Sequence, residues 1–140
     1  MQTLVDTAAQ AGNFTTLIGT LQAGSLIDTL RTTGPYTLFA PTDAAFRRLV
    51  PGALDTLLKD TGRLYEFLAL HVVPRIVMLK DVTSGAIETL GGASLTAARA
   101  AGEVFVNGVS ISRADIEASN GVMHVIDEVI LPFGERLAVA

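Results

Sequence analysis

A change in hydrophobic period near residue 75 constrains the fold of this chain more than any other feature. Before it, apolar residues recur mainly at spacings of three and four, as in Phe14, Leu17, Ile18 and Leu21, which is the pattern of amphipathic helices. From Ile76 onward they alternate in short runs separated by glycine turns, which is the pattern of strands. Helices followed by strands are typical of an α+β fold.

Three turn signals divide the second half into strands. Gly91-Gly92, Asn107-Gly108 and Asn120-Gly121 each stand between runs that alternate apolar and polar residues. An Asn-Gly pair suits a type I′ hairpin turn because both central residues need positive φ. The sequence therefore predicts an antiparallel meander over this half.

The helical half contains one expected strand, Tyr36–Pro41, with the sequence YTLFAP. Proline ends it because it cannot donate to a ladder. Thr42 can cap a following helix, and the helix dipole favours Asp43 in the first turn. The other helices are predicted from four apolar rows: Phe14, Leu17, Ile18 and Leu21; Leu26, Ile27 and Leu30; Leu54, Leu57 and Leu58; Leu64, Phe67, Leu68 and His71.

Length and composition narrow the functional classes. With 140 residues the chain suits a single domain over 1–140, with a core at about 4–132 and a tail at 133–140. The absence of cysteine excludes disulfides and thiolate chemistry. A net charge of −4 without a basic stripe argues against nucleic acid as a partner. A membrane span is not expected either, because the sequence has no apolar run of about 20 residues. No signal peptide is expected in the chain as given.

The stretch SNGVMHVIDEVILP raises the question of a catalytic pair, because His124 and Asp127 lie three residues apart. Its β-branched residues and its boundaries, Asn-Gly and Pro132, favour a strand. Residues three apart in a strand point to opposite faces, with His124 beside Val122 and Ile126. The two side chains are therefore not expected to bond to each other.

Other chemical sites have weaker support. His71, the only other histidine, ends an apolar helical row, so both histidines are expected to be core residues rather than bases. A remote dyad that uses either one stays open as a hydrolase hypothesis. Asp115 and Glu117 would share a face of an extended strand and could hold calcium weakly, but exposed carboxylates at a sheet edge are the commoner outcome. No cofactor or metal motif occurs, and none is expected to bind.

Three blocks together are similar to a known family. TLFAPTDAAF (37–46), LALHVVP (68–74) and ADIEASNGVMHVIDEVILP (114–132) resemble, in order and spacing, the signature blocks of the fasciclin (FAS1 or beta-Ig-H3) domain. The resemblance implies a wedge of about seven mainly antiparallel strands with an N-terminal helical layer. It makes Thr42, Asp43, Asn120, His124 and Asp127 motif residues.

The resemblance also implies a non-catalytic adhesion module that is secreted, periplasmic or at the cell surface. Its partners would be a cell-surface or matrix protein or a polysaccharide, and a self-associating structural unit is the alternative. In animal members an Asp-Ile pair and a Tyr-His block are implicated in binding; here they match Asp115-Ile116 and the region of His71. Leu70 stands where the family often has tyrosine, and Arg75 where glycine is common.

Overall fold

The structure is a computed structural model that describes residues 3–24, 26–32, 34–48, 58–59, 61–82, 85–90, 92, 94–100 and 102–130. The helices are α1 (Leu4–Ala11), α2 (Thr15–Ala23), α3 (Ile27–Thr32), α4 (Asp43–Arg47), α6 (Thr61–Ala69) and the 3-10 helix η1 (Leu79–Asp81). The strands are β1 (Tyr36–Pro41), β2 (Val72–Val73), β3 (Gly85–Glu88), β4 (Ser94–Ala100), β5 (Glu103–Val106), β6 (Val109–Ala118) and β7 (Gly121–Ile126).

The seven strands form one sheet in the order β2-β1-β7-β6-β5-β4-β3. Strands β3 to β7 follow one another as the antiparallel meander that the glycine turns predict. Strand β1 pairs in parallel with β7 and antiparallel with β2. The Leu90 amide donates to the Val72 carbonyl oxygen at 2.8 Å, which links the end of β3 to β2 and almost closes the sheet. The α+β prediction is confirmed.

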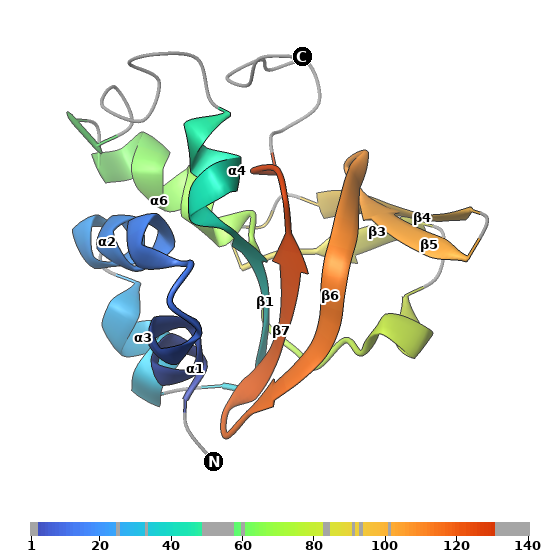
Figure 1. Cartoon of the computed structure of the whole chain (residues 1–140), viewed down its shortest axis with the longest axis horizontal. Coiled ribbons are helices and arrows are strands. Elements are labelled where there is room, and N and C mark those ends of the chain that lie inside the picture. The colour runs from blue at the N-terminus through green and yellow to red at the C-terminus, as the bar shows by residue number, and fades with distance from the viewer. Residues whose placement is uncertain are drawn as a thin grey trace.

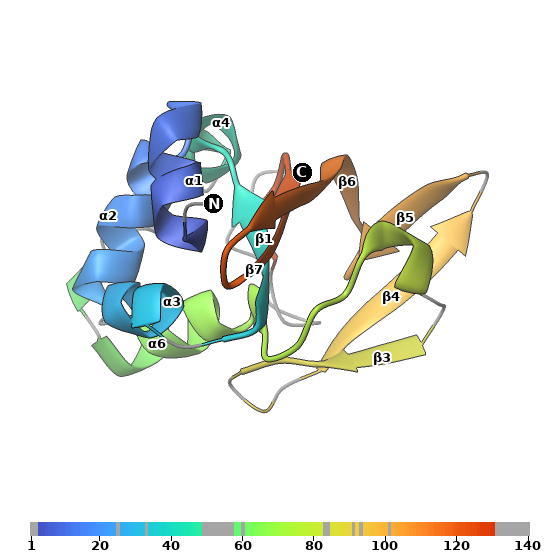
Figure 2. The same cartoon turned by 90° about the horizontal axis from the view of Figure 1, so that it is seen from below.

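Strands β1 and β7 lie in the middle of the molecule, with helices on one side and the β3–β5 hairpins on the other (Figures 1 and 2). Every residue of both strands is buried. Met123 and Val125 belong to the core under the helices, whereas Phe39 and Ile126 belong to the core under the hairpins. A strand covered on both faces needs mostly apolar residues, which explains why His124 is the one polar side chain in β7.

The two turns that flank β6 have different causes: local backbone conformation at Asn107-Gly108, and tertiary packing at Asn120-Gly121. Asn107 and Gly108 both have positive φ, 49° and 80°, as the type I′ prediction requires. Gly121 instead begins β7, and a Cβ there would lie 1.9 Å from the Tyr36 carbonyl oxygen. This second glycine is needed because β1 approaches closely, and not because of a turn conformation.

Helix α1 was not predicted from the sequence. Its signals are short: the Thr3 hydroxyl accepts the Asp6 amide at 3.3 Å as an N-cap, Leu4, Val5 and Ala8 are buried, and Gly12 ends the helix with φ 83°. Such a cap and a left-handed glycine are ordinary helix boundaries. The predicted helix around Leu54 and Leu57, and the tail at 133–140, lie outside the described residues.

Candidate functional site

The suspected pair of His124 and Asp127 does not form. His124 is fully buried in β7, whereas Asp127 follows the strand and is exposed. The imidazole accepts the Asp115 amide at Nδ1 (3.1 Å) and contacts the Val77 carbonyl oxygen at Nε2 (2.7 Å). Since an amide can only donate and a carbonyl can only accept, the neutral ring carries its proton on Nε2. The predicted separation is confirmed.

His71 has the same kind of environment with the opposite tautomer. It lies just beyond α6, with 1% of its surface exposed, and its ring packs on that of Phe67 at 5.1 Å between centroids. Nδ1 donates to the Phe67 carbonyl oxygen and Nε2 accepts the Ile130 amide, both at 2.9 Å. The ring therefore joins the end of α6 to the segment that follows β7.

Burial sets the protonation state of both histidines. Loss of water around the ring lowers the pKa of His71 to about 4, against a smaller opposing effect of the Phe67 carbonyl. Burial likewise lowers the pKa of His124, opposed by the Val77 carbonyl and the Asp115 carboxylate. The 3.9 Å approach of Asp115 Oδ1 to His124 Nδ1 is thus no ion pair at neutral pH. With both nitrogens bonded to main chain, neither ring has a free lone pair for a substrate proton.

His71 therefore cannot touch a partner directly, although the resemblance places it in a binding block. A side chain with 1% exposure presents no contact surface. Any effect of His71 on binding must act through the backbone of Phe67 and Ile130, which it holds.

Asp115 occupies an unusual backbone position on β6. Its φ is 59°, and the register with β7 shifts on both sides of Arg113, so β6 carries a bulge here. Positive φ is uncommon for a residue with a side chain, but aspartate tolerates it better than most. Asp115 and Glu117 are nevertheless both exposed, as expected of carboxylates at a sheet edge, because the β5 pairing described for β6 reaches only Val109 and Ser110.

The bulge presents Asp115 to solvent while holding its backbone. Its side chain is 39% exposed and accepts the Leu79 amide at Oδ1 (2.8 Å), while its own amide donates to His124. Ile116 is half-buried and packs against the helical core, and Glu117 is exposed. Asp115 and Ile116 thus differ: one faces outward, and the other anchors the strand.

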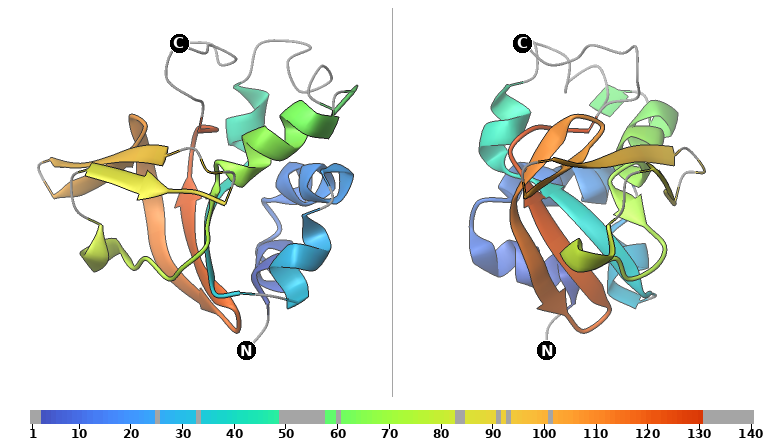
Figure 3. Two further views of the ribbon diagram at one scale, coloured as in Figure 1. Left: turned by 180° about the vertical axis from the view of Figure 1, so that it is seen from behind. Right: turned by 90° about the vertical axis from the view of Figure 1, so that its right-hand side faces the viewer.

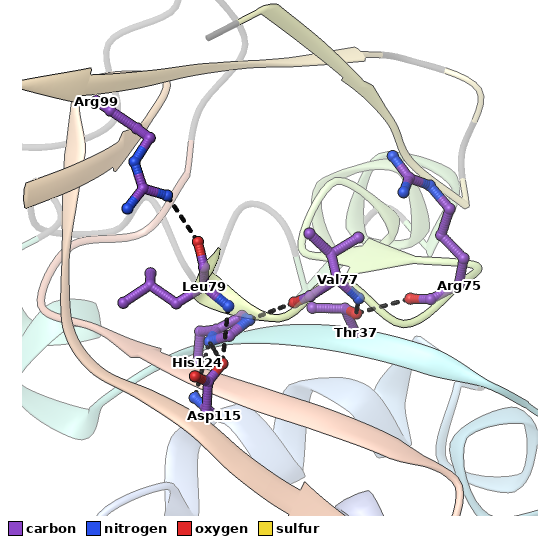
Figure 4. Close-up of polar contacts among 7 residues, drawn as sticks. All are labelled: Thr37, Arg75, Val77, Leu79, Arg99, Asp115 and His124. Carbon is purple, nitrogen blue, oxygen red and sulfur yellow. Dashed lines mark hydrogen bonds and ion pairs between the residues drawn. The ribbon is translucent and has the colours of Figure 1, made fainter. Parts of the chain in front are cut away.

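A strap of residues 75–79 runs beside this bulge and is fixed at several points (Figure 4). The Thr37 hydroxyl donates to the Arg75 carbonyl oxygen (2.6 Å) and accepts the Val77 amide (2.8 Å). The Arg99 guanidinium donates to the Leu79 carbonyl oxygen at 2.8 Å. Sequence reasoning missed Thr37 and Arg99. A threonine inside an apolar strand was the available signal, since a buried hydroxyl needs partners.

Thr42 and Asp43 act at the start of α4, the first within that helix and the second toward α2. The Thr42 hydroxyl accepts the Ala45 amide at 3.2 Å and caps α4. The Asp43 carboxylate accepts the Thr16 amide at 2.7 Å, and that bond lowers the pKa of Asp43.

Asn120 ties the β6–β7 turn to two helices. Its Oδ1 accepts the Leu4 amide at 2.9 Å, and its Nδ2 donates to the Leu30 carbonyl oxygen at 2.5 Å. Helices α1 and α3 are thereby fixed to the turn through a single side chain.

The described part of the chain offers neither a cluster of metal ligands nor a membrane-spanning helix. Within it, no group of three or more histidine, aspartate or glutamate side chains is placed to hold a metal ion. None of its helices combines the length and apolar character needed to cross a bilayer.

The fasciclin domain profile matches residues 12–132. The chain belongs to the fasciclin domain family. Protein sll1483 of Synechocystis sp. is 42% identical over 132 residues, covering 93% of this chain and 73% of that protein. The cell surface glycolipoprotein MPB83 of Mycobacterium bovis is 34% identical over 77% of this chain and 48% of its own length.

The fold agrees with a solved fasciclin structure. A FAS1 domain pair from the insect cell adhesion molecule Fasciclin I superposes with a TM-score of 0.76, 21% identity, and coverage of 94% of this chain and 51% of that one. This likeness supports the predicted FAS1 fold. Fasciclin domains thus occur in a cell adhesion molecule and in a cell surface protein.

Proposed function

We propose that this fasciclin domain, one unit over residues 4–132, is a non-catalytic binding module. It mediates adhesion to a cell surface or matrix from a secreted, periplasmic or surface-attached position. The observation that carries the proposal is the bulge at Asp115, where a carboxylate is held outward at φ 59° by the Leu79 amide and by His124. Backbone strain kept in place by surrounding groups is a mark of functional positions.

Two further observations support adhesion over catalysis. Both histidines use their two nitrogens on main-chain groups, so the hydrolase alternative lacks a base. Relatives of the family include a cell surface glycolipoprotein and an insect cell adhesion molecule. We assign the binding surface of this domain to Asp115 together with the strand segment that Ile116 anchors.

The test uses plates coated with the purified domain, scored for retained Synechocystis cells and for captured matrix protein and polysaccharide. Asp115→Asn is the informative variant because it keeps an acceptor for Leu79 and tolerates positive φ while removing the charge. We expect Asp115→Asn to lower retention about fivefold or more, the order of one lost charged contact. Glu103→Gln, an exposed carboxylate on β5, is the matched control and should leave retention unchanged. No retention by the parent domain on any surface would remove the proposal.

A further inference from the structure

A solvent-open groove of about 700 Å³ lies beside the β6–β7 turn. The residues that line it come from the turn at 34–35, from Ile76 and Met78 of the strap, and from residues 117–122 around the β6–β7 turn. Figure 2 views the molecule from the side of this turn, and Figure 3 shows the η1 segment on the face of the sheet away from the helices. We propose that this groove binds an extended protein segment in which an aliphatic side chain stands next to a basic one.

The main chain is tightly packed where residues 34–36 meet the β6–β7 turn. A Cβ on Gly121 would meet the Tyr36 carbonyl oxygen at 1.9 Å, and one on Gly34 would meet the Asn120 carbonyl oxygen at 2.8 Å. The Tyr36 amide donates to that same Asn120 oxygen at 3.0 Å, and the Asn120 side chain is fixed to two helices. The groove is therefore preformed, which lowers the cost of ordering on binding.

The strap contributes apolar side chains to the groove because its hydrogen bonds fix which of its residues point inward. Val77 is buried, and its amide and carbonyl are bonded to Thr37 and His124. With the middle residue turned inward, its neighbours Ile76 and Met78 face the groove. Ile76 is 42% exposed, a level that few large apolar side chains in the described residues reach. Methionine adapts to varied partners and is frequent at peptide-binding surfaces.

The basic side chain of the proposed ligand is inferred from the charge of the groove. Glu117 is the charged residue among the described residues that line the groove, and it is exposed. A carboxylate at the rim of an aliphatic surface favours a lysine or arginine beside the docked side chain, and it contributes to specificity more than to affinity. None of the described residues that line the groove is aromatic. Because sugar rings stack on aromatic side chains, we assign the groove to a protein segment instead of a glycan.

This inference takes from the proposed function only that the domain binds other macromolecules, and it does not involve Asp115. The probes are three fluorescent eight-residue peptides that differ at two central positions: leucine–lysine, leucine–glutamate and serine–lysine. Fluorescence anisotropy measures binding to the intact 140-residue chain. We expect the leucine–lysine peptide to bind at least tenfold more tightly than either of the others, a factor that corresponds to about 1.4 kcal/mol.

Variants then locate the binding. Ile76→Ser should weaken the leucine–lysine peptide about tenfold, and Glu117→Lys should reverse the preference in favour of leucine–glutamate. The matched controls are Tyr65→Ser, at an exposed side chain on α6, and Glu103→Lys on β5. Neither should change the affinity for the peptides. Thermal melting confirms that each variant is folded.

Three outcomes overturn the inference: equal binding of all peptides, Glu117→Lys without a reversal, or an Ile76-dependent signal with a soluble oligosaccharide but not with the peptides. Asp115→Asn separates the two proposals, because it should reduce cell retention and leave peptide affinity unchanged. Peptide binding without any cell retention would contradict the adhesion proposal and leave the groove proposal standing. Cell retention without peptide binding would contradict the groove proposal and leave the adhesion proposal standing.

Discussion

Replacing His71 with alanine tests whether a buried imidazole joins α6 to the segment after β7. The change removes a fully packed ring and leaves the Phe67 carbonyl and the Ile130 amide without their partner. The cavity and the orphaned groups together should cost about 2–4 kcal/mol, toward the lower end if a water enters and bonds to both groups. Urea unfolding at pH 7.5 measures the difference, and a change below about 0.5 kcal/mol would place the ring outside the core.

The same side chain should make stability depend on pH. The folded pKa of about 4 lies below the value of 6.5 for the exposed ring, so the fold favours the neutral form. The contribution of His71 to stability is complete above pH 6.5 and is lost as the pH falls from 6.5 through 4. Between pH 7 and pH 5 the free energy of unfolding should fall by about 2 kcal/mol, because each unit of pKa difference between the folded and unfolded chain corresponds to about 1.36 kcal/mol.

His71→Gln is the matched variant for this pH effect. Glutamine keeps one donor and one acceptor but does not titrate. The free energy of unfolding of the parent should therefore fall more steeply than that of His71→Gln between pH 7 and pH 5, by about 2 kcal/mol. Parallel curves for the two proteins would refute the argument, because they would mean that His71 binds its proton equally well in the folded and unfolded chain.

Substitutions at three positions test other parts of the fold by chemical denaturation. Gly121→Ala forces a methyl group against the Tyr36 carbonyl oxygen and should cost about 3 kcal/mol or prevent folding; a loss under about 1 kcal/mol would mean that β1 and β7 lie further apart. Gly19→Ala has open space around the added methyl in α2, so it should stabilise by about 0.5–1 kcal/mol, and any destabilisation would contradict the helix there. Thr42→Ala removes the acceptor for the Ala45 amide and should cost about 1 kcal/mol, whereas Thr42→Ser should cost much less.

Local chemistry predicted the parts of the fold that depend on few residues. The hairpin at Asn107-Gly108 follows from the positive φ of both positions, and the cap of α4 follows from Thr42. The alternation in β7 correctly placed His124 and Asp127 apart.

Features that depend on distant partners were not predictable. The parallel pairing of β1 with β7 joins segments that lie far apart in the sequence, and no local pattern specifies it. The bulge at Asp115 exists because Leu79 and His124 hold it, and neither partner is recognisable from the five residues around it. The groove beside the β6–β7 turn likewise requires the strap to be fastened by Thr37.

The central claim is that both imidazoles are structural, so that neither histidine is available as a base. Long-range ¹H–¹⁵N correlation spectra of the folded protein, recorded from pH 6 to 8, test it most directly. We expect two neutral rings over this range, His71 with its proton on Nδ1 and His124 with its proton on Nε2. A ring that titrates near its ordinary pKa, or that exchanges between tautomers, would have a nitrogen free for proton transfer and would contradict the account.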